Sequence, residues 1–336
     1  MISRIPLALL FLIHYATYCT SVAAQDSAYS AVGEHKVIVV HTVKLQDKKR
    51  NKNIEALVRY PDGAGPFPIV VFSHGSFANK EAFGPASAHW ASHGYIVIHP
   101  NHADARIDAE VGGLGRSRSS GGLSGALGSG GRIERIKDVT SVLDALDQVE
   151  TAIPALHGKL DANWIAVAGH SFGAYVAQCH GGVKTLVDGK PENLSDSRVK
   201  CVVAISAQGE SQNYGLTAES WFDARTPALH ITGTRDRSAP DRPGGPFGDV
   251  NTKKIPFERS PAGGKYLLII EGATHVSFGG KLGRLRGGVD AAGLTKYVSL
   301  AFLDAFLKQN AQAKAWLDGE EATNWLGRQA SLQRKL

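Results

Sequence analysis

A serine in a tight glycine turn is the strongest chemical signal in this sequence. The segment Gly169-His170-Ser171-Phe172-Gly173 follows an apolar run at residues 164–168 and precedes an apolar helical stretch. The pattern G-x-S-x-G between a strand and a helix raises the serine hydroxyl above a sheet and points the next backbone N–H at the same space. We therefore predict that Ser171 is a nucleophile and that the N–H of Phe172 is one oxyanion donor.

A serine hydroxyl is a weak nucleophile near neutral pH, so it needs a base and a group that orients the base. Asp236 comes shortly after an expected strand at 228–231, and His275 comes shortly after one at 266–270. The chain order Ser, acid, His is typical of hydrolases with this serine turn. We predict that His275 takes the proton of Ser171 while Asp236 holds the other ring nitrogen. Asp241 and Asp223 remain alternatives for the acid.

A second glycine turn follows an early apolar run at residues 69–72. The segment Val71-Phe72-Ser73-His74-Gly75-Ser76 leads from that run into a loop. Hydrolases of this kind take their second oxyanion donor from such a loop. We predict that the N–H of Ser76 supplies it and that His74 shapes the loop.

The segment His99-Pro100-Asn101-His102-Ala103-Asp104 is a competing constellation, because two histidines and a carboxylate are possible metal ligands. Its spacing matches no zinc signature, so we expect a structural or pocket-lining role. Residues 112–131 are rich in Gly and Ser, but they lack the strand, helix and acidic partner of a dinucleotide site. We predict neither a metal nor a cofactor.

Strand and helix patterns alternate from about residue 35 onward. Continuous apolar runs are typical of strands buried on both faces. Apolar residues recur every three or four positions over residues 133–149, which predicts a helix, and a last helix is predicted at 294–307. The alternation predicts a mostly parallel central sheet with helices on both faces. The expected strands are 36–43 and 54–60 as an antiparallel opening, then 69–72, 95–98, 164–168, 201–205, 228–231 and 266–270.

Two segments interrupt the alternation. Residues 112–131 follow the expected strand at 95–98, and they fit either a surface insertion or a lid over the site. Residues 237–264 are rich in Pro and Gly and are expected to form a long loop.

The first residues resemble an export signal. Arg4 precedes an apolar run at 5–13, and Val22-Ala23-Ala24 provides the small residues of a cleavage site. We expect residues 1–24 to be removed and residues 25–336 to form one domain in a secreted or periplasmic protein. The apolar run is too short to cross ~30 Å of hydrocarbon, so no membrane span is expected. The formal charge of +6 is spread along the chain, which argues against a nucleic-acid partner.

Two cysteines, Cys179 and Cys201, remain after removal of residues 1–24. Cys179 lies about two turns along the helix after Ser171, at ~3.6 residues per turn. Cys201 begins the next strand, so both are expected at the edge of the sheet away from the site. We consider a disulfide between them, with two separate buried thiols as the alternative.

Several segments carry a family resemblance: Phe72-Ser73-His74-Gly75-Ser76, Ala91-Ser92-His93-Gly94-Tyr95, the turn around Ser171, and residues 135–146 with Asp138. Together they resemble the platelet-activating-factor acetylhydrolase and bacterial dienelactone-hydrolase-like branch of the α/β-hydrolases, over roughly residues 35–310. Dienelactone hydrolases use a cysteine nucleophile, whereas a serine stands here, which points to ordinary esters.

The resemblance implies an α/β-hydrolase fold with Ser171 as nucleophile, Asp236 as acid and His275 as base. It also implies backbone oxyanion donors at Ser76 and Phe172. We expect a cofactor-free serine esterase that favours a short acyl group. Polyester or lipid esters, a non-catalytic binding protein and a metal-dependent hydrolase are the alternatives. The sequence leaves the acyl and alcohol groups and the oligomeric state open.

Overall fold

A nine-stranded sheet forms the centre of the molecule in the computed structural model, which describes residues 29–105, 129–238, 249–280 and 288–336. The strand order is β1-β2-β4-β3-β5-β8-β9-β10-β11. The bounds of these strands are β1 Val37–Asp47, β2 Lys52–Pro61, β3 Phe67–Ser73, β4 Ile96–Pro100, β5 Leu160–His170, β8 Val199–Ile205, β9 Ala228–Arg235, β10 Lys265–Thr274 and β11 Ala330–Lys335.

The six strands from β4 to β10 in the sheet order run parallel, and the antiparallel pairs lie at the two ends. Strands β1 and β2 pair antiparallel, as expected, and β2 continues antiparallel onto β4. The parallel strands are continuous apolar runs because helices cover both of their faces. The predicted α/β-hydrolase fold is confirmed.

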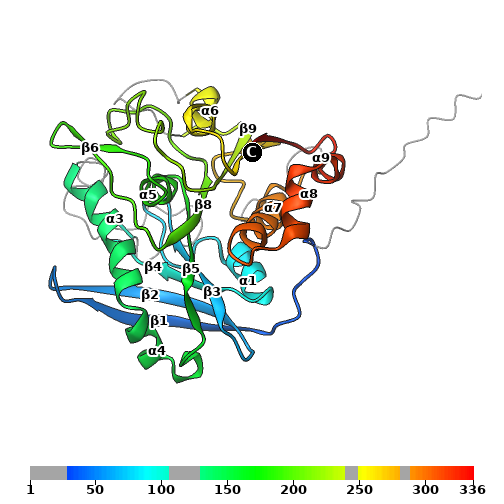
Figure 1. Cartoon of the computed structure of the whole chain (residues 1–336). Coiled ribbons are helices and arrows are strands. Elements are labelled where there is room, and N and C mark those ends of the chain that lie inside the picture. Colours follow the sequence, from blue (N-terminus) through cyan, green and yellow to red (C-terminus); the bar gives the residue numbers. More distant parts are fainter. Residues whose placement is uncertain (1–28, 106–128, 239–248, 281–287) are drawn as a thin grey trace, which may run out of the picture.

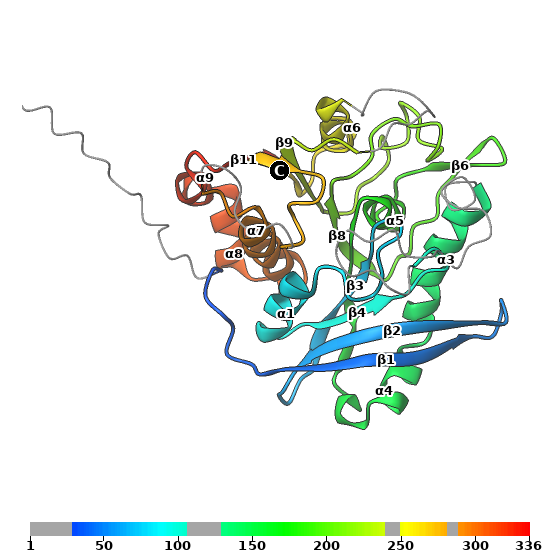
Figure 2. The same cartoon turned by 180° about the vertical axis from the view of Figure 1, so that it is seen from behind.

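Apart from α6, the helices lie in two groups, one on each face of the sheet (Figures 1 and 2). Buried side chains of α3, α4 and α5 share one apolar cluster with one face of the strands, and those of α1, α7, α8 and α9 share another with the opposite face. The helix bounds are α1 Gly84–Ser92, α3 Ser129–Asp144, α4 Leu146–Ala152, α5 Phe172–His180, α6 Ile255–Arg259, α7 Ala291–Phe306, α8 Ala311–Asp318 and α9 Glu320–Leu326.

The helix predicted over residues 133–149 is two helices, because Ala145 leaves the helical conformation at φ −117° between α3 and α4. Val142 of α3 and Val149 of α4 still lie in the same apolar cluster. The apolar period therefore continues through the break, since both helices pack on one face of the sheet.

The long loop expected at residues 237–264 is only partly correct. Residues 239–248 lie outside the described residues, but a 3₁₀ helix, η2 (Val250–Lys254), and helix α6 follow. The carboxylate of Asp249 accepts from the N–H of Asn251 and caps η2, while Pro256 stands in the first turn of α6. Phe257 is buried, which anchors this segment. The C-terminal strand β11 was also not expected.

Several smaller elements complete the fold. Strands β6 (Thr185–Val187) and β7 (Lys190–Glu192) form a separate hairpin, and η1 (Pro154–Leu156) precedes β5. The Gly/Ser-rich segment predicted at 112–131 ends inside α3, which begins at Ser129; its remainder, like the predicted export signal at 1–24, lies outside the described residues.

The predicted disulfide is wrong: Cys179 and Cys201 are both free and buried. Cys179 belongs to the apolar cluster that contains α5, whereas Cys201 belongs to the cluster on the opposite face of the sheet. Successive strand residues point to opposite faces, so Val202 meets the α5 side and Cys201 points away from it. The sheet itself separates the two sulfur atoms.

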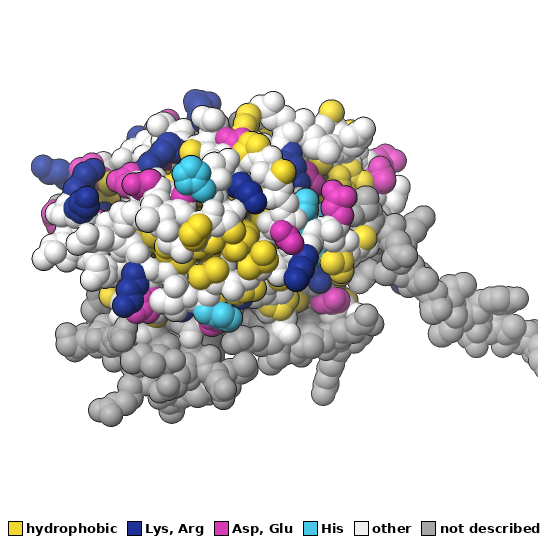
Figure 3. All heavy atoms as spheres, turned by 90° about the horizontal axis from the view of Figure 1, so that it is seen from below, with side chains coloured by type: hydrophobic (Ala, Val, Ile, Leu, Met, Phe, Trp, Pro, Cys, Tyr) yellow, Lys and Arg dark blue, Asp and Glu magenta, His cyan; other side chains and the backbone are white. Residues whose placement is uncertain are grey.

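Figure 3 shows the face of the molecule that lies at the bottom of Figure 1, where β1 and α4 are found. A central patch of hydrophobic side chains is surrounded there by charged ones. Strand β1 is at the edge of the sheet, and its Val39 is 38% exposed. Within the described ranges, none of the helices combines the length and apolar character needed to cross a membrane.

Candidate active site

Ser171 lies in a strained turn between β5 and α5. Its backbone φ is +54° and ψ is −115°, a conformation that side-chain-bearing residues rarely adopt. A Cβ on Gly169 would lie 2.3 Å from the backbone of Gly173, and one on Gly173 would lie 1.8 Å from the carbonyl oxygen of Ser73. Both glycines are therefore required where β5, α5 and the end of β3 meet.

The structure brings together the three side chains that the sequence singled out. Nε2 of His275 lies 3.0 Å from Oγ of Ser171, and Nδ1 of the same ring lies 3.1 Å from Oδ1 of Asp236. These residues follow β5, β10 and β9, whose carboxyl ends meet at one edge of the sheet. The His275 side chain is 22% exposed and that of Asp236 is fully buried. Of the two side chains, therefore, only the imidazole is open to solvent.

Ser206 is a further polar contact of this group, and sequence reasoning missed it. Its Oγ lies 2.9 Å from Oδ1 of Asp236 and 2.8 Å from Nδ1 of His275. An ionised carboxylate can only accept, so the single hydroxyl proton goes to Asp236 and the oxygen accepts from the ring. Nδ1 of His275 therefore carries a proton, and Nε2 is free to accept one from Ser171.

The backbone of Ser206 explains how a residue directly after β8 reaches this position. Its φ is +53°, and its N–H donates to the carbonyl of Ile231 at 2.7 Å. The left-handed conformation turns the chain at the strand end. It is strained for a residue with a side chain and persists only where the surrounding structure holds it in place. The sequence signal that could have found Ser206 is a serine directly after an apolar strand, because β8 ends at the same edge of the sheet as β5, β9 and β10.

Asp236 is held by several donors. Besides Ser206 and His275, the hydroxyl of Thr232 donates to its Oδ2 at 2.9 Å. Burial alone raises the pKa of Asp236, but the hydrogen bond from His275 and the positive charge of Lys253 outweigh it, so the pKa is lowered overall. Asp236 is therefore an ionised, fixed acceptor for the imidazole.

Neither alternative acid competes with Asp236. Asp223 is exposed and pairs with Lys184, whose Nζ lies 2.7 Å from its Oδ2. Asp241 lies outside the described residues.

His170 supports the segment that carries His275. Its Nε2 lies 2.8 Å from the carbonyl oxygen of His275, and the two ring centroids are 4.8 Å apart. The ring of Phe83 lies on His170 with centroids 5.1 Å apart. Burial, and then the neighbouring His275, lower the pKa of His170 to about 3. His170 is therefore a neutral hydrogen-bonding spacer at neutral pH.

The two segments that carry the predicted oxyanion donors both approach Ser171. Phe172 is the first residue of α5, where a backbone N–H has no acceptor within its own helix. The loop after β3 passes close by, because a Cβ on Gly75 would lie 3.5 Å from Cβ of Ser171. The next residue in that loop is Ser76, while the N–H of Phe77 is already directed to Asp104 at 3.3 Å.

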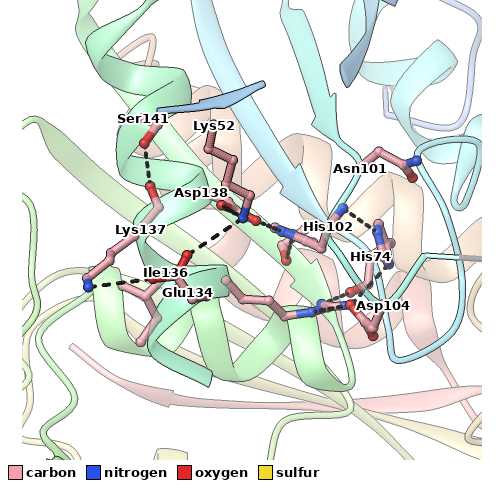
Figure 4. Close-up of polar contacts among 12 residues, drawn as sticks. Lys52, His74, Asn101, His102, Asp104, Glu134, Ile136, Lys137, Asp138 and Ser141 are labelled. Atoms are coloured by element: carbon pink, nitrogen blue, oxygen red, sulfur yellow. Dashed lines mark hydrogen bonds and ion pairs between the residues drawn. The ribbon is translucent and has the colours of Figure 1, made fainter. Parts of the chain in front are cut away.

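His102 and Asp104, from the segment at residues 99–104, take part in a buried hydrogen-bond network (Figure 4). Nε2 of His102 lies 2.9 Å from Oγ of Ser73, and its Nδ1 lies 3.1 Å from Oδ2 of Asp138. Asp138 in turn accepts from Lys52 at 2.6 Å. His99 is buried with its ring 5.1 Å from that of Phe72. The described part of the chain contains no group of three or more His, Cys, Asp or Glu side chains placed to hold a metal ion.

Comparisons with known proteins agree with this architecture. A family profile described as Chlorophyllase matches residues 26–110. A platelet-activating factor acetylhydrolase of Cavia porcellus is 24% identical over 290 residues, which cover 74% of this chain and 60% of that protein. The chain thus spans about 60% of the relative's length, less than two thirds. With the fold, these similarities support placement in the platelet-activating-factor acetylhydrolase-like branch of the α/β-hydrolases.

Proposed function

We propose that this protein is a serine hydrolase that cleaves carboxylic esters through an acyl-enzyme. The observation that carries the proposal is the chain of contacts from Ser171 through His275 to Asp236, at 3.0 and 3.1 Å. A serine, a histidine with its proton on the far nitrogen, and a buried carboxylate in this order are the arrangement that activates a hydroxyl for acyl transfer.

In the proposed reaction, Nε2 of His275 removes the proton of Ser171 while Oγ attacks the ester carbonyl. The negative charge that develops on the carbonyl oxygen is stabilised by the N–H groups of Phe172 and Ser76. Collapse of the tetrahedral intermediate breaks the bond to the alcohol oxygen, which takes the proton from His275. Water then attacks the acyl-enzyme by the same steps and releases the acid.

For the substrate, we propose a small ester with a short acyl group. The relative from Cavia porcellus is named an acetylhydrolase, and an acetyl group is a short acyl group. Val276, next to His275, is 57% exposed and provides apolar surface beside the proposed base. We further propose that residues 1–24 direct export, on the basis of their charge and hydrophobic pattern.

The decisive experiment uses a fluorophosphonate probe and a series of p-nitrophenyl esters of increasing acyl length. We expect the protein to be labelled once, at Ser171, and to turn over the shortest esters fastest. Ser171→Ala should abolish labelling and reduce kcat by about 10⁶-fold, as in other serine hydrolases, without loss of the fold. Ser195→Ala, at a serine remote in sequence, is the control.

Labelling of Ser171→Ala at the normal rate, or near-normal turnover by that variant, would exclude the proposed nucleophile. A maximum at long acyl chains would leave the nucleophile in place and overturn only the short-acyl preference. Sequencing of the N-terminus of the exported protein tests the export signal, which requires a mature chain beginning at Gln25.

A further inference from the structure

We propose that Arg135 is a positioning residue that holds both proposed oxyanion donors, the N–H groups of Ser76 and Phe172, in their working orientation. This inference rests on the proposed function. Arg135 lies on α3, more than thirty positions from either donor in the sequence, and only 3% of its surface is exposed. It contacts the loop of one donor and the side chain of the other.

The first contact fixes the peptide group that contains the N–H of Ser76. Nη2 of Arg135 donates to the carbonyl oxygen of Gly75 at 3.3 Å, and Nη1 donates to that of His74 at 2.6 Å. The carbonyl of Gly75 and the N–H of Ser76 belong to one planar, trans peptide and point in opposite directions. Holding the carbonyl toward Arg135 therefore holds the N–H away from it.

His74 is a further donor to the carbonyl oxygen of Gly75, which also accepts from the backbone N–H of Ala78 at 3.2 Å. Nε2 of His74 accepts from the backbone N–H of His102 at 3.2 Å, so the ring proton lies on Nδ1. Nδ1 then donates to the carbonyl oxygen of Gly75 at 2.8 Å. Burial, and then the charge of Arg135, lower the pKa of His74 far below its ordinary value, which keeps the ring neutral. Figure 4 shows His74 beside His102 and Asp104.

The second contact reaches the other donor. Cζ of Arg135 lies 4.3 Å from the centroid of the Phe172 ring, which is a cation–π distance. Phe172 is fully buried and begins α5, so its ring and its backbone N–H move together with the helix start. One guanidinium thus joins the loop after β3 to the first turn of α5.

The guanidinium is itself fixed by Asp104. Nε and Nη2 of Arg135 lie 2.9 and 2.7 Å from Oδ1 of Asp104, and Nη2 lies 2.9 Å from Oδ2. This forked pairing sets the plane of the guanidinium, which a lysine cannot reproduce. Oδ2 also accepts from the N–H of Phe77 at 3.3 Å, so Asp104 holds the loop on the far side of Ser76.

The proposal predicts a defect in stabilising the transition state and not in binding the ester. Arg135→Lys keeps the charge that balances Asp104 but loses the fork. We expect kcat to fall about 10- to 100-fold, less than the 10²–10³ for complete loss of an oxyanion donor, with KM changed less than about twofold.

The diagnostic measurement is inhibition by a trifluoromethyl ketone, which adds to the serine and places an oxyanion between the two donors. Its affinity should fall by the same factor as kcat/KM, while the affinity of the matching non-fluorinated ketone stays unchanged. Asp104→Asn should give the same pattern with a smaller loss of kcat and of ketone affinity. It replaces Arg135→Lys as the test variant if Arg135→Lys does not fold.

Arg132→Lys is the matched control, because Arg132 is another buried arginine of α3 whose bonds go to the carbonyls of Asn213 and Leu186. It should leave kcat and ketone affinity unchanged. The inference would be overturned if folded Arg135→Lys kept the kcat and ketone affinity of the wild type, or if Arg132→Lys showed equal losses. In either case, labelling of the wild type at Ser171 would still uphold the esterase proposal. Failure of the wild type to be labelled at Ser171 would instead refute the proposed function.

Discussion

The hydroxyl of Ser206 lies 2.8 Å from Nδ1 of His275, closer than the 3.1 Å between that nitrogen and the nearest carboxylate oxygen of Asp236. The imidazole of His275 is thus oriented by two acceptors that are themselves hydrogen-bonded to each other. One of them was not recognisable from the order of motifs along the chain.

We predict that Ser206→Ala lowers kcat/KM about 10- to 100-fold, because a hydrogen bond to a group that becomes charged contributes about 1.5–3 kcal/mol. The loss should appear in kcat, measured with the shortest active p-nitrophenyl ester. Ser206→Thr, which keeps the hydroxyl, should recover part of the activity. Equal activity in the wild type and the alanine variant would show that Asp236 alone orients the imidazole.

Asp236 and one alternative acid, Asp223, can be separated by matched substitutions. Asp236→Asn should reduce kcat by about 10⁴-fold, because the amide favours the wrong tautomer of His275. Asp223→Asn should have no effect on kcat, since that carboxylate is exposed and bound to Lys184. A large loss in the Asp223 variant, with an active Asp236 variant, would reverse the assignment of the acid.

Buried histidines should make the protein sensitive to acid. His230 of β9 is buried, and within the described residues neither ring nitrogen has a hydrogen-bond partner. Burial, and then the charge of Lys265, lower its pKa from 6.5 to about 3. Between these values the unfolded chain binds a proton that the folded chain does not, so stability is full above pH 6.5 and falls toward pH 3.

His230→Leu should therefore flatten the dependence of the unfolding free energy on pH by up to ~1.4 kcal/mol per pH unit, measured by urea denaturation between about pH 7 and 4.5. Ile231→Val, a packing change at the next position, should shift the curve without changing its slope. Parallel curves for the wild type and His230→Leu would contradict the proton linkage.

The two cysteines should react only on unfolding. Both are buried, and burial raises the pKa of Cys179 to about 12 and raises that of Cys201 as well. A chain lacking residues 1–24 should show no titratable thiol when native and two when denatured without reductant. Fewer than two after denaturation would indicate a bridge and contradict the separation of the sulfur atoms by the sheet.

The sequence by itself determined the elements whose signals are local. Continuous apolar runs indicated the parallel strands, because a strand that is buried on both faces shows no polar alternation. The last predicted strand, 266–270, lies within β10, and the first, 36–43, overlaps β1. Ser171, Asp236 and His275 could be selected in the same way. Each comes just after an apolar run, and parallel strands end at one edge of the sheet.

Only the tertiary structure decided which distant groups meet at that edge and which face each side chain takes. Ser206 and Arg135 reach the site across 69 and 61 positions of sequence, through contacts to His275 and to His74, and no local pattern encodes such contacts. Cys201 shows the same limit for a single side chain. Its position at the edge of the sheet away from the site could be deduced from the sequence, but the pleat of the strand turned its sulfur to the face opposite Cys179.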